Sequence, residues 1–209
     1  MPPKTAKRSN LAAKKEKHRQ QILRAAEGLF YSKGFAATPL REIIRESKLS
    51  TTVFYSLFQS KRDLLVELVL PLGEEINRKL NEAFKDSSDN GDPIEKAINI
   101  VLQVYARHRR LTKIYVSETA AQNLHSDSPL RKVMDRLREL VIVQLKIATT
   151  KGFFRPADST IFAYSVIGMI DMHLYRWAVL GDITTKNMIA GASALAQVFR
   201  SGIVQGGKK

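Results

Sequence analysis

The sequence has 209 residues, of which 44% are hydrophobic and 26% charged, a composition typical of a soluble globular protein of one or two domains. It has no run of 18 apolar residues and no apolar segment behind its polar N-terminus, so we expect neither a membrane span nor a secretory signal. The absence of cysteine excludes disulfide and thiolate chemistry and is compatible with a cytoplasmic protein. The net charge is +14, and residues 1–65 carry 14 Lys and Arg against 5 Asp and Glu. This concentration of positive charge favours a nucleic-acid-binding N-terminal part.

Residues 1–17 are polar and rich in lysine, without a sustained apolar period. This pattern predicts a basic, disordered arm. Such an arm can lie along the phosphates or in the minor groove of DNA, and the alternative is a solvated tail that contributes only general charge.

Two amphipathic helices are predicted next, over about residues 18–32 and 39–48. In the second of these, Thr38 is the predicted N-cap, Pro39 occupies the first helical position, and the helix ends near Lys48. The apolar residues of the two helices are Ile22, Ala25, Ala26, Leu29, Phe30, Leu40, Ile43 and Ile44.

A third helix, one to two turns long, is predicted from Thr51 to Leu57, with Ser50 as its N-cap. An isolated helix shorter than about 12 residues is marginal in water, so packing must stabilise this one. Its expected inward residues are Val53, Leu57 and Phe58. The outward positions carry the hydroxyl groups of Thr51, Thr52, Tyr55 and Ser56. A short, hydroxyl-rich helix set across another helix predicts a helix-turn-helix, whose second helix enters the major groove of DNA.

A longer helix is predicted over about residues 60–85, with Ser60 as its cap and Lys61 and Arg62 in its first turn. Cations at a helix N-terminus oppose the macrodipole, so a phosphate bound at this end is one explanation for them. Pro71 is expected to bend or break this helix near Leu70.

The helices and turns described so far contain a recognisable set of residues in register: Ile22, Ala25, Ala26, Leu29, Phe30, Gly34, Thr38, Ile43, Ser50, Phe54, Tyr55, Phe58, Ser60, Lys61 and Leu64. With these residues, the segment 22–65 closely resembles the DNA-binding domain of TetR-family transcriptional repressors. The family often has Ala-Gly where this chain has Ser47 and Lys48, Gly where it has Thr52, and His where it has Leu57.

The predicted DNA-binding residues are Thr38, Lys48, Ser50, Thr51, Thr52, Tyr55, Ser56 and Lys61. Among them, Thr51 and Thr52 are the expected base readers. The expected phosphate contacts are Thr38, Tyr55, Ser56 and Lys61.

Five further helices are predicted over about residues 93–109, 111–124, 129–150, 159–180 and 184–204, and no strand pattern competes. The expected fold class is therefore all-α, with about nine helices. Residues 1–17 would form the arm, 18–66 a three-helix helix-turn-helix domain, and 67–205 a helical ligand-binding and dimerisation domain. The last two helices are apolar on several faces, which predicts that they meet a second copy across a twofold axis. TetR-like proteins form homodimers in this way.

Patterns for catalysis or metal binding are lacking, so we expect no enzyme activity and no cofactor. The four histidines, His18, His108, His125 and His173, have no partner at metal-ligand spacing, and the sequence contains no phosphate-binding loop or nucleophile elbow.

The resemblance implies a ligand cavity between the middle helices of the C-terminal domain. The candidate lining residues are Tyr105, His108, Tyr115, Thr119, Met134, Leu137, Val141, Met169, His173 and Trp177. Ordinary core packing or dimer contacts would explain each of them equally well. Four cations beside these aromatic residues could hold an anionic ligand such as an acyl-CoA, or could form a solvated face: Arg107, Arg109, Arg110 and Lys113.

The resulting interpretation is a homodimeric, ligand-responsive transcriptional repressor of palindromic, double-stranded operator DNA, released by a small apolar or amphipathic effector. Three alternatives remain. One is a regulator of the same fold without a small-molecule effector, either controlled by a protein partner or acting as an activator. The second is a basic all-α protein that binds anionic membranes or RNA through residues 1–17. The third is a small helical enzyme.

Overall fold

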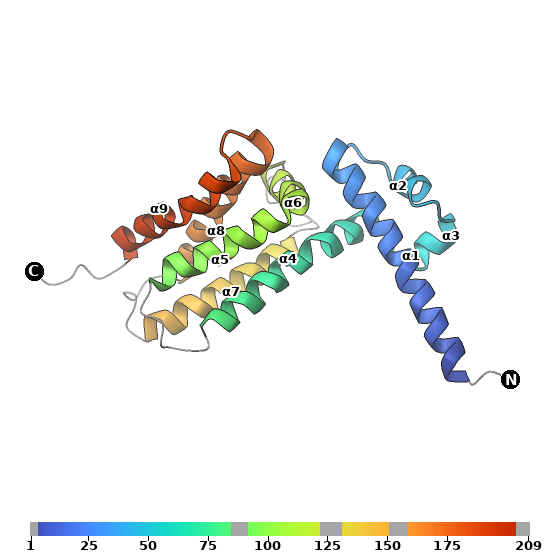
Figure 1. Ribbon diagram of the computed structural model, residues 1–209, viewed down its shortest axis with the longest axis horizontal. Helices are drawn as coiled ribbons and strands as arrows, with labels where there is room; N and C mark the ends of the chain where they lie inside the picture. Colours follow the sequence, from blue (N-terminus) through green and yellow to red (C-terminus); the bar gives the residue numbers. More distant parts are fainter. Residues whose placement is uncertain (1–3, 85–91, 122–130, 151–158, 204–209) are drawn as a thin grey trace, which may run out of the picture. The chain divides into compact units, whose positions relative to one another are not determined.

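The computed structural model describes residues 4–84, 92–121, 131–150 and 159–203. Within these ranges the regular structure is entirely helical, which confirms the predicted all-α class. The helices are α1 (Lys4–Lys33), α2 (Leu40–Glu46), α3 (Thr51–Tyr55), α4 (Lys61–Ala83), α5 (Pro93–Arg107), α6 (Arg109–Ala121), α7 (Arg131–Thr150), α8 (Ser159–Tyr175), the π-helical turn η1 (Arg176–Leu180) and α9 (Thr185–Ile203) (Figure 1).

The chain divides into two compact units, Met1–Leu68 and Val69–Lys209. Helix α4 belongs to both units, because it begins in the first and continues into the second. The division falls two residues after the boundary expected at residues 66 and 67.

Helix α1 begins at Lys4, so the prediction of a disordered arm is wrong for residues 4–17. Residues 1–3 lie outside the described ranges. The prediction relied on the absence of an apolar period, but this segment is rich in Ala and Lys, with Arg, Glu and Leu, and these residues favour a helix even where no face is buried. This segment is also continuous with the packed helix that follows, so it extends an existing helix and needs no nucleus of its own.

The core of the first unit forms where α1, α2 and α3 meet the start of α4. Ile22, Ala26, Ile43 and Phe54 are all completely buried. The inward face predicted for α3 needs correction, because Phe54 is its buried residue whereas Val53 and Leu57 are only half-buried. In a helix of five residues the apolar period covers barely one turn, so it cannot decide which side faces the core.

In the second unit, α5 packs along α9 and α7 packs along α8, while α6 contacts α8 and η1. The core residues of this unit are Val69, Leu72, Ile76, Ile98, Leu102, Val104, Tyr105, Ile114, Tyr115, Val116, Ala163, Ile170, Leu174, Trp177, Ala178, Met188, Ala192, Ala196 and Phe199.

Pro71 does not break α4, which runs without interruption from Lys61 to Ala83. Proline lacks the N–H that would bond to the Glu67 carbonyl, and this loss normally disfavours a helix interior. The buried side chains of Leu68, Val69 and Leu72 surround the proline in sequence, so packing of this turn compensates for the missing bond.

The helix predicted over residues 159–180 is α8 followed by η1, whose wider turn ends at Gly181 with a left-handed φ of 71°. Trp177 lies in this π-helical turn and is 1% exposed. Its indole N–H donates a hydrogen bond of 3.1 Å to the Thr185 hydroxyl at the start of α9. A π-helical turn requires a local change of hydrogen-bond pattern that apolar periodicity does not encode.

Candidate nucleic-acid interface

Helix α3 presents four hydroxyl groups from a rigid support. The Ser50 hydroxyl accepts a hydrogen bond of 3.3 Å from the Val53 N–H, which confirms the predicted N-cap. The side chains of Thr51, Thr52, Tyr55 and Ser56 are exposed, as predicted, and 55% of Tyr55 is accessible. On the opposite side the buried ring of Phe54 lies 6.0 Å from that of Phe58. The short helix is thus anchored by the aromatic side chain of Phe54, and its polar side chains are exposed, although the Ser56 hydroxyl donates to the Val53 carbonyl at 2.7 Å.

The turn before α3 holds Lys48 in the left-handed conformation, with φ at 55°. Its N–H donates to the Arg45 carbonyl at 3.1 Å, and its side chain is exposed. The preceding Ser47 is buried, and its carbonyl accepts a 2.6 Å bond from the Gln21 side chain. A residue with a Cβ costs about 1 kcal/mol in this conformation relative to glycine. The chain therefore places an exposed cation beside α3 at a position that glycine would occupy with less strain.

Thr38 has a different role from the one predicted. It is completely buried, and its hydroxyl donates to the Gly34 carbonyl at 2.7 Å. Pro39 stands at the N-cap position of α2 and makes no side-chain capping bond. Since the Thr38 side chain is buried, the geometry favours a structural bond that closes the turn after α1 over the predicted contact with a phosphate.

Lys61 at the start of α4 is also held inside the unit. Its ammonium group donates to the carbonyls of Phe35 at 2.6 Å and Thr38 at 2.9 Å, and lies 4.3 Å from the centre of the Phe35 ring. These contacts supply the reason for a cation at this helix end that the sequence left open. The geometry favours Lys61 as an anchor for the loop between α1 and α2 rather than as the predicted phosphate contact.

Ser60 caps α4 as predicted, and it does so within a capping box. Its hydroxyl accepts a 3.2 Å bond from the Asp63 N–H, while the Asp63 carboxylate accepts bonds from the N–H groups of Gln59 and Ser60 at 2.9 and 3.0 Å. The carboxylate thus occupies two N–H groups that a phosphate at this helix end would otherwise use.

The exposed cations of the first unit that were not among the predicted site residues include Arg41 and Arg45 on α2, and Arg62 on α4. Their signal in the sequence was the spacing of four between the two arginines of α2, which places both on one side of that helix. Lys33 at the end of α1 bonds to Glu42 between them, and this hydrogen bond holds the pKa of the Glu42 carboxyl below its usual value.

Within the second unit, two predicted ligand-binding residues form one aromatic pair. The rings of Tyr105 and Tyr115 are buried and stacked, with 5.9 Å between their centres. The Tyr115 hydroxyl donates to the Asp171 carboxylate at 3.4 Å. Burial raises the pKa of Asp171 to about 7, and the bond from Tyr115 opposes this rise. Asp171 was not among the predicted site residues, because a lone acidic residue in a helix gives no indication of what it faces.

His173 and Trp177 make contacts typical of core residues. The His173 Nε2 atom lies 2.9 Å from the Met188 carbonyl oxygen, and the ring rests against the backbone of Gly191. The other half-buried candidates are Thr119, Val141 and Met169, and the Thr119 hydroxyl donates to the Val116 carbonyl at 3.1 Å. The side chains of Met134 and Leu137 lie outside the described residues.

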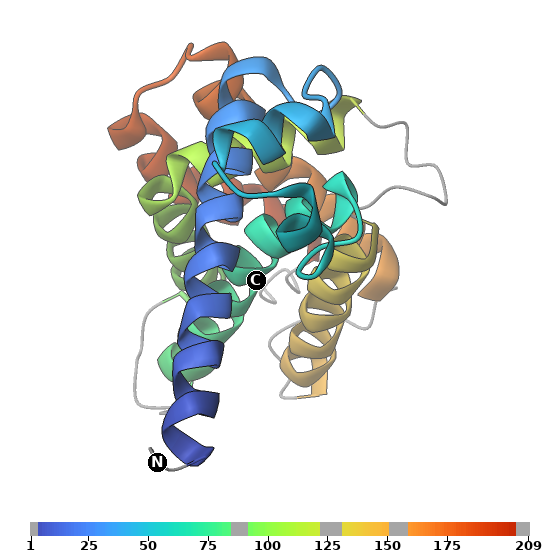
Figure 2. The ribbon, with the colours of Figure 1, turned by 90° about the vertical axis from the view of Figure 1, so that its right-hand side faces the viewer.

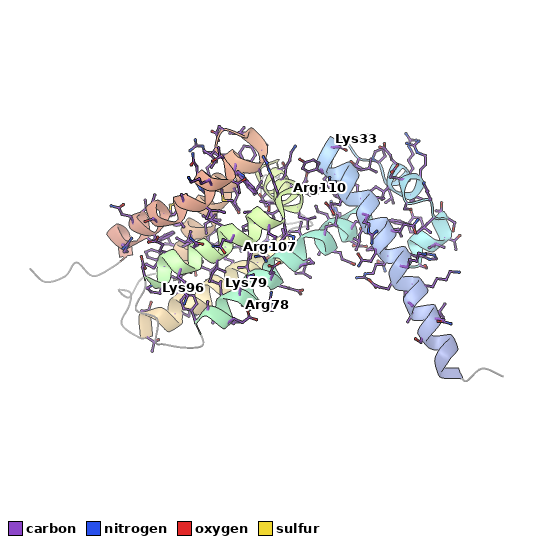
Figure 3. All side chains as sticks on the ribbon, viewed as in Figure 1. Lys33, Arg78, Lys79, Lys96, Arg107 and Arg110 are labelled. Atoms are coloured by element: carbon purple, nitrogen blue, oxygen red, sulfur yellow. The ribbon has the colours of Figure 1, made fainter. Side chains whose placement is uncertain are left out.

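The cations predicted to hold an anionic ligand make contacts in different places, and Figure 3 labels two of them, Arg107 and Arg110. Arg107 donates to one Glu75 oxygen at 2.7 Å, and His108 lies 2.8 Å from the other. The guanidinium group of Arg109 lies 5.1 Å from the centre of the Trp177 ring. The His108 hydrogen bond holds the pKa of the Glu75 carboxyl below its usual value. Glu75 therefore joins α4 to the end of α5.

In the ranges that the structure describes, no three His, Asp or Glu side chains come together as a metal site would require. None of the described helices has the length and apolar content needed to cross a membrane.

Residues 22–68 match the family model "Bacterial regulatory proteins, tetR family". The chain is 24% identical to the transcriptional regulator HbdR of Aromatoleum sp. strain CIB over 167 residues, 78% of this chain and 70% of HbdR. It is 23% identical to the transcriptional repressor NicS of Pseudomonas putida over 168 residues, 79% of each chain.

The fold is similar to that of FadR from Bacillus subtilis, solved in complex with stearoyl-CoA, with a TM-score of 0.74 and 16% identity over 88% of this chain and 98% of FadR. The matched segment covers α3 with its capped, exposed hydroxyl surface, and the likeness of fold to FadR extends into the second unit. The chain is a member of the TetR family of DNA-binding transcriptional regulators.

Proposed function

We propose that the protein is a homodimeric repressor that acts in the cytoplasm, binds palindromic operator DNA and is released by a small effector. The observation that carries the proposal is the surface of α3, which exposes four side chains with hydroxyl groups while Phe54 is buried in the core. Thr51 and Thr52 lie at the start of the helix, where recognition helices contact base edges. Tyr55 and Ser56 are the proposed phosphate contacts, together with Lys48 and Ser50 at the N-terminal side.

Exposed apolar residues on α8 and α9 support the homodimer. Ile161, Tyr164 and Met172 are 65%, 51% and 61% exposed, and Val198 on α9 is 58% exposed. At helical spacing the three α8 residues lie along one face, together with Gly168. A soluble protein rarely leaves such a stripe in water, and a second copy of the same helix pair would cover it. Two copies would provide two α3 helices for the two halves of a palindrome.

The effector is proposed to bind in the second unit, near the aromatic pair of Tyr105 and Tyr115. The complex of FadR with stearoyl-CoA supports an amphipathic acyl-CoA as the first ligand to test. An effector that moves α5 or α6 would act on α4 through Glu75, which bonds to Arg107 and His108. Release then requires that the effector bind one arrangement of α4 more tightly than the other.

The experiment is a titration of acyl-CoAs of increasing chain length into a complex of the full-length protein with its selected operator, followed by fluorescence anisotropy. Sedimentation of the protein measures its oligomeric state in parallel, with Met172→Lys as the variant expected to be monomeric. Release by a subset of acyl chains from a dimeric complex supports the proposal. A dimer that holds its operator at every acyl-CoA concentration excludes this effector class, and a monomeric wild type contradicts the proposed assembly.

A further inference from the structure

The N-terminal half of α1 extends beyond the core of the first unit. Residues 9–17 are all exposed, and Ile22 is the first buried residue of the helix. The ribbon shows this part of α1 continuing past α3 toward the N-terminus in both views (Figures 1 and 2). A helix without a buried face gains no stability from tertiary packing. Packing therefore does not restrict which residues stand in this segment, and contact with a partner can determine them.

One face of this segment carries most of its positive charge. At 3.6 residues per turn, positions 4, 8, 11 and 15 fall on one line along the helix, and positions 7 and 14 flank that line. The cations at these positions are Lys4, Lys7, Arg8, Lys14 and Lys15, which we call the basic stripe. The opposite face has Ala6, Ser9, Asn10 and Ala13, with Lys17 as its one cation.

The line of positions 4, 8, 11 and 15 continues the side of α1 that packs against the rest of the first unit. Continued at the same spacing, this line passes through Ile22 and Ala26, which are completely buried in the core. Arg19 marks the point where α1 leaves the core, because it pairs with Glu67 of α4 at 2.5 Å and lies over the Phe58 ring. By helical spacing, the positions of the basic stripe therefore continue the packed face of α1 beyond the core.

Like charges three and four residues apart weaken a helix. Solubility would be served equally well by charges on every face, so a binding partner explains the basic stripe better. A regular line of negative charge fits it, and the sugar-phosphate backbone provides one. A membrane surface fits less well, since a helix that lies on lipid needs a broad apolar face and this line contains only Leu11.

We propose that the basic stripe lies along the phosphates of the DNA that flanks the bases contacted by α3. From Lys4 to Lys15 the helix rises about 17 Å, which corresponds to about five nucleotides of one strand. The bound site would thus extend about five base pairs beyond the bases that α3 reads. The proposal rests on the assignment of α3 as the DNA-reading helix.

Two charge variants of the full-length protein test this proposal. The neutral variant combines Lys4→Gln, Arg8→Gln and Lys15→Gln. The relocated variant keeps the net charge and moves the same cations to the opposite face, and it combines Lys4→Ala, Arg8→Ala, Lys15→Ala, Ala6→Lys, Asn10→Arg and Ala13→Lys. Circular dichroism of both variants checks that α1 remains helical.

Affinity is measured by fluorescence anisotropy over a salt series, with a selected duplex and with the same duplex extended by about five base pairs at each end. The wild type is expected to bind the extended duplex more tightly, and both variants are expected to lose this gain. Their affinity should fall roughly tenfold, and the slope of log K against log salt should decrease by about 2 to 3.

A relocated variant that binds like the wild type overturns the proposal, because net charge alone would then explain the effect. A neutral variant with unchanged binding overturns it as well. If the neutral variant binds DNA like the wild type but no longer binds phosphatidylglycerol vesicles, the stripe is assigned to a membrane instead. If no DNA sequence is preferred, the assignment of α3 fails, and the salt slopes on a random duplex still report whether the stripe contacts phosphates.

Discussion

A substitution of Lys61 distinguishes most clearly between a structural role and a contact with DNA. The substitution Lys61→Met keeps the aliphatic part of the side chain and removes the ammonium group that bonds to the carbonyls of Phe35 and Thr38. A hydrogen bond from a charged group contributes about 1.5 to 3 kcal/mol, and partial exposure of Lys61 reduces the total. We therefore expect the free energy of unfolding of the first unit to fall by about 2 to 3 kcal/mol.

The assay is urea unfolding followed by far-ultraviolet circular dichroism, with Arg62→Met as the matched control. Arg62 is the next residue on α4, carries the same charge and is exposed, so its substitution should change stability by less than about 0.5 kcal/mol. In DNA binding, Lys61→Met should weaken affinity at every salt concentration through the displaced loop and leave the salt slope unchanged. A stable Lys61→Met protein whose salt slope is smaller by about 1 would refute this reasoning and would restore Lys61 as a phosphate contact.

Three further predictions concern single residues. Lys48→Gly should raise the free energy of unfolding by about 0.5 to 1 kcal/mol, since φ is positive there, and should weaken DNA binding; unchanged stability would contradict the strain. Because the pKa of Asp171 is raised, the folded wild type holds a proton between about pH 4 and pH 7 that the unfolded chain releases, so its free energy of unfolding should fall as the pH rises through this range. Asp171→Asn should remove this fall. Equal pH profiles of the two proteins in urea unfolding would disprove the prediction. Gly191→Ala should destabilise the second unit by about 1 to 3 kcal/mol, since its Cβ would lie 2.5 Å from His173, whereas Gly28→Ala has free space and serves as the control in thermal unfolding.

Features set by local sequence were predictable. Apolar spacing located all nine helices found in the described ranges, and the serines at positions 50 and 60 identified the starts of α3 and α4. The exposed residues of α3 were also predicted from their hydroxyl groups, although the apolar period did not identify Phe54 as its buried residue. Each of these features depends on residues a few positions apart in the chain.

Features set by contacts between distant residues were not predictable. The partners of Lys61 lie more than 20 residues earlier, in a loop whose carbonyls converge only after folding. The burial of Thr38 depends on the same loop. The bond between Tyr115 and Asp171 spans 56 positions, and no periodicity connects these residues. The helical N-terminus of α1 was missed for the opposite reason, since a helix can form from propensity without any contact at all.

The central claim is that α3 reads operator DNA, and selection of duplexes from a random pool by the full-length protein tests it most directly. The account predicts recovery of a palindrome with half-sites about one helical turn apart or a multiple of it, bound by one or two dimers. Thr51→Ala and Thr52→Ala should change the preferred bases, whereas Tyr55→Phe should weaken binding to all sequences alike. A pool without sequence preference, or a preference unaffected by both threonine substitutions, would contradict the claim.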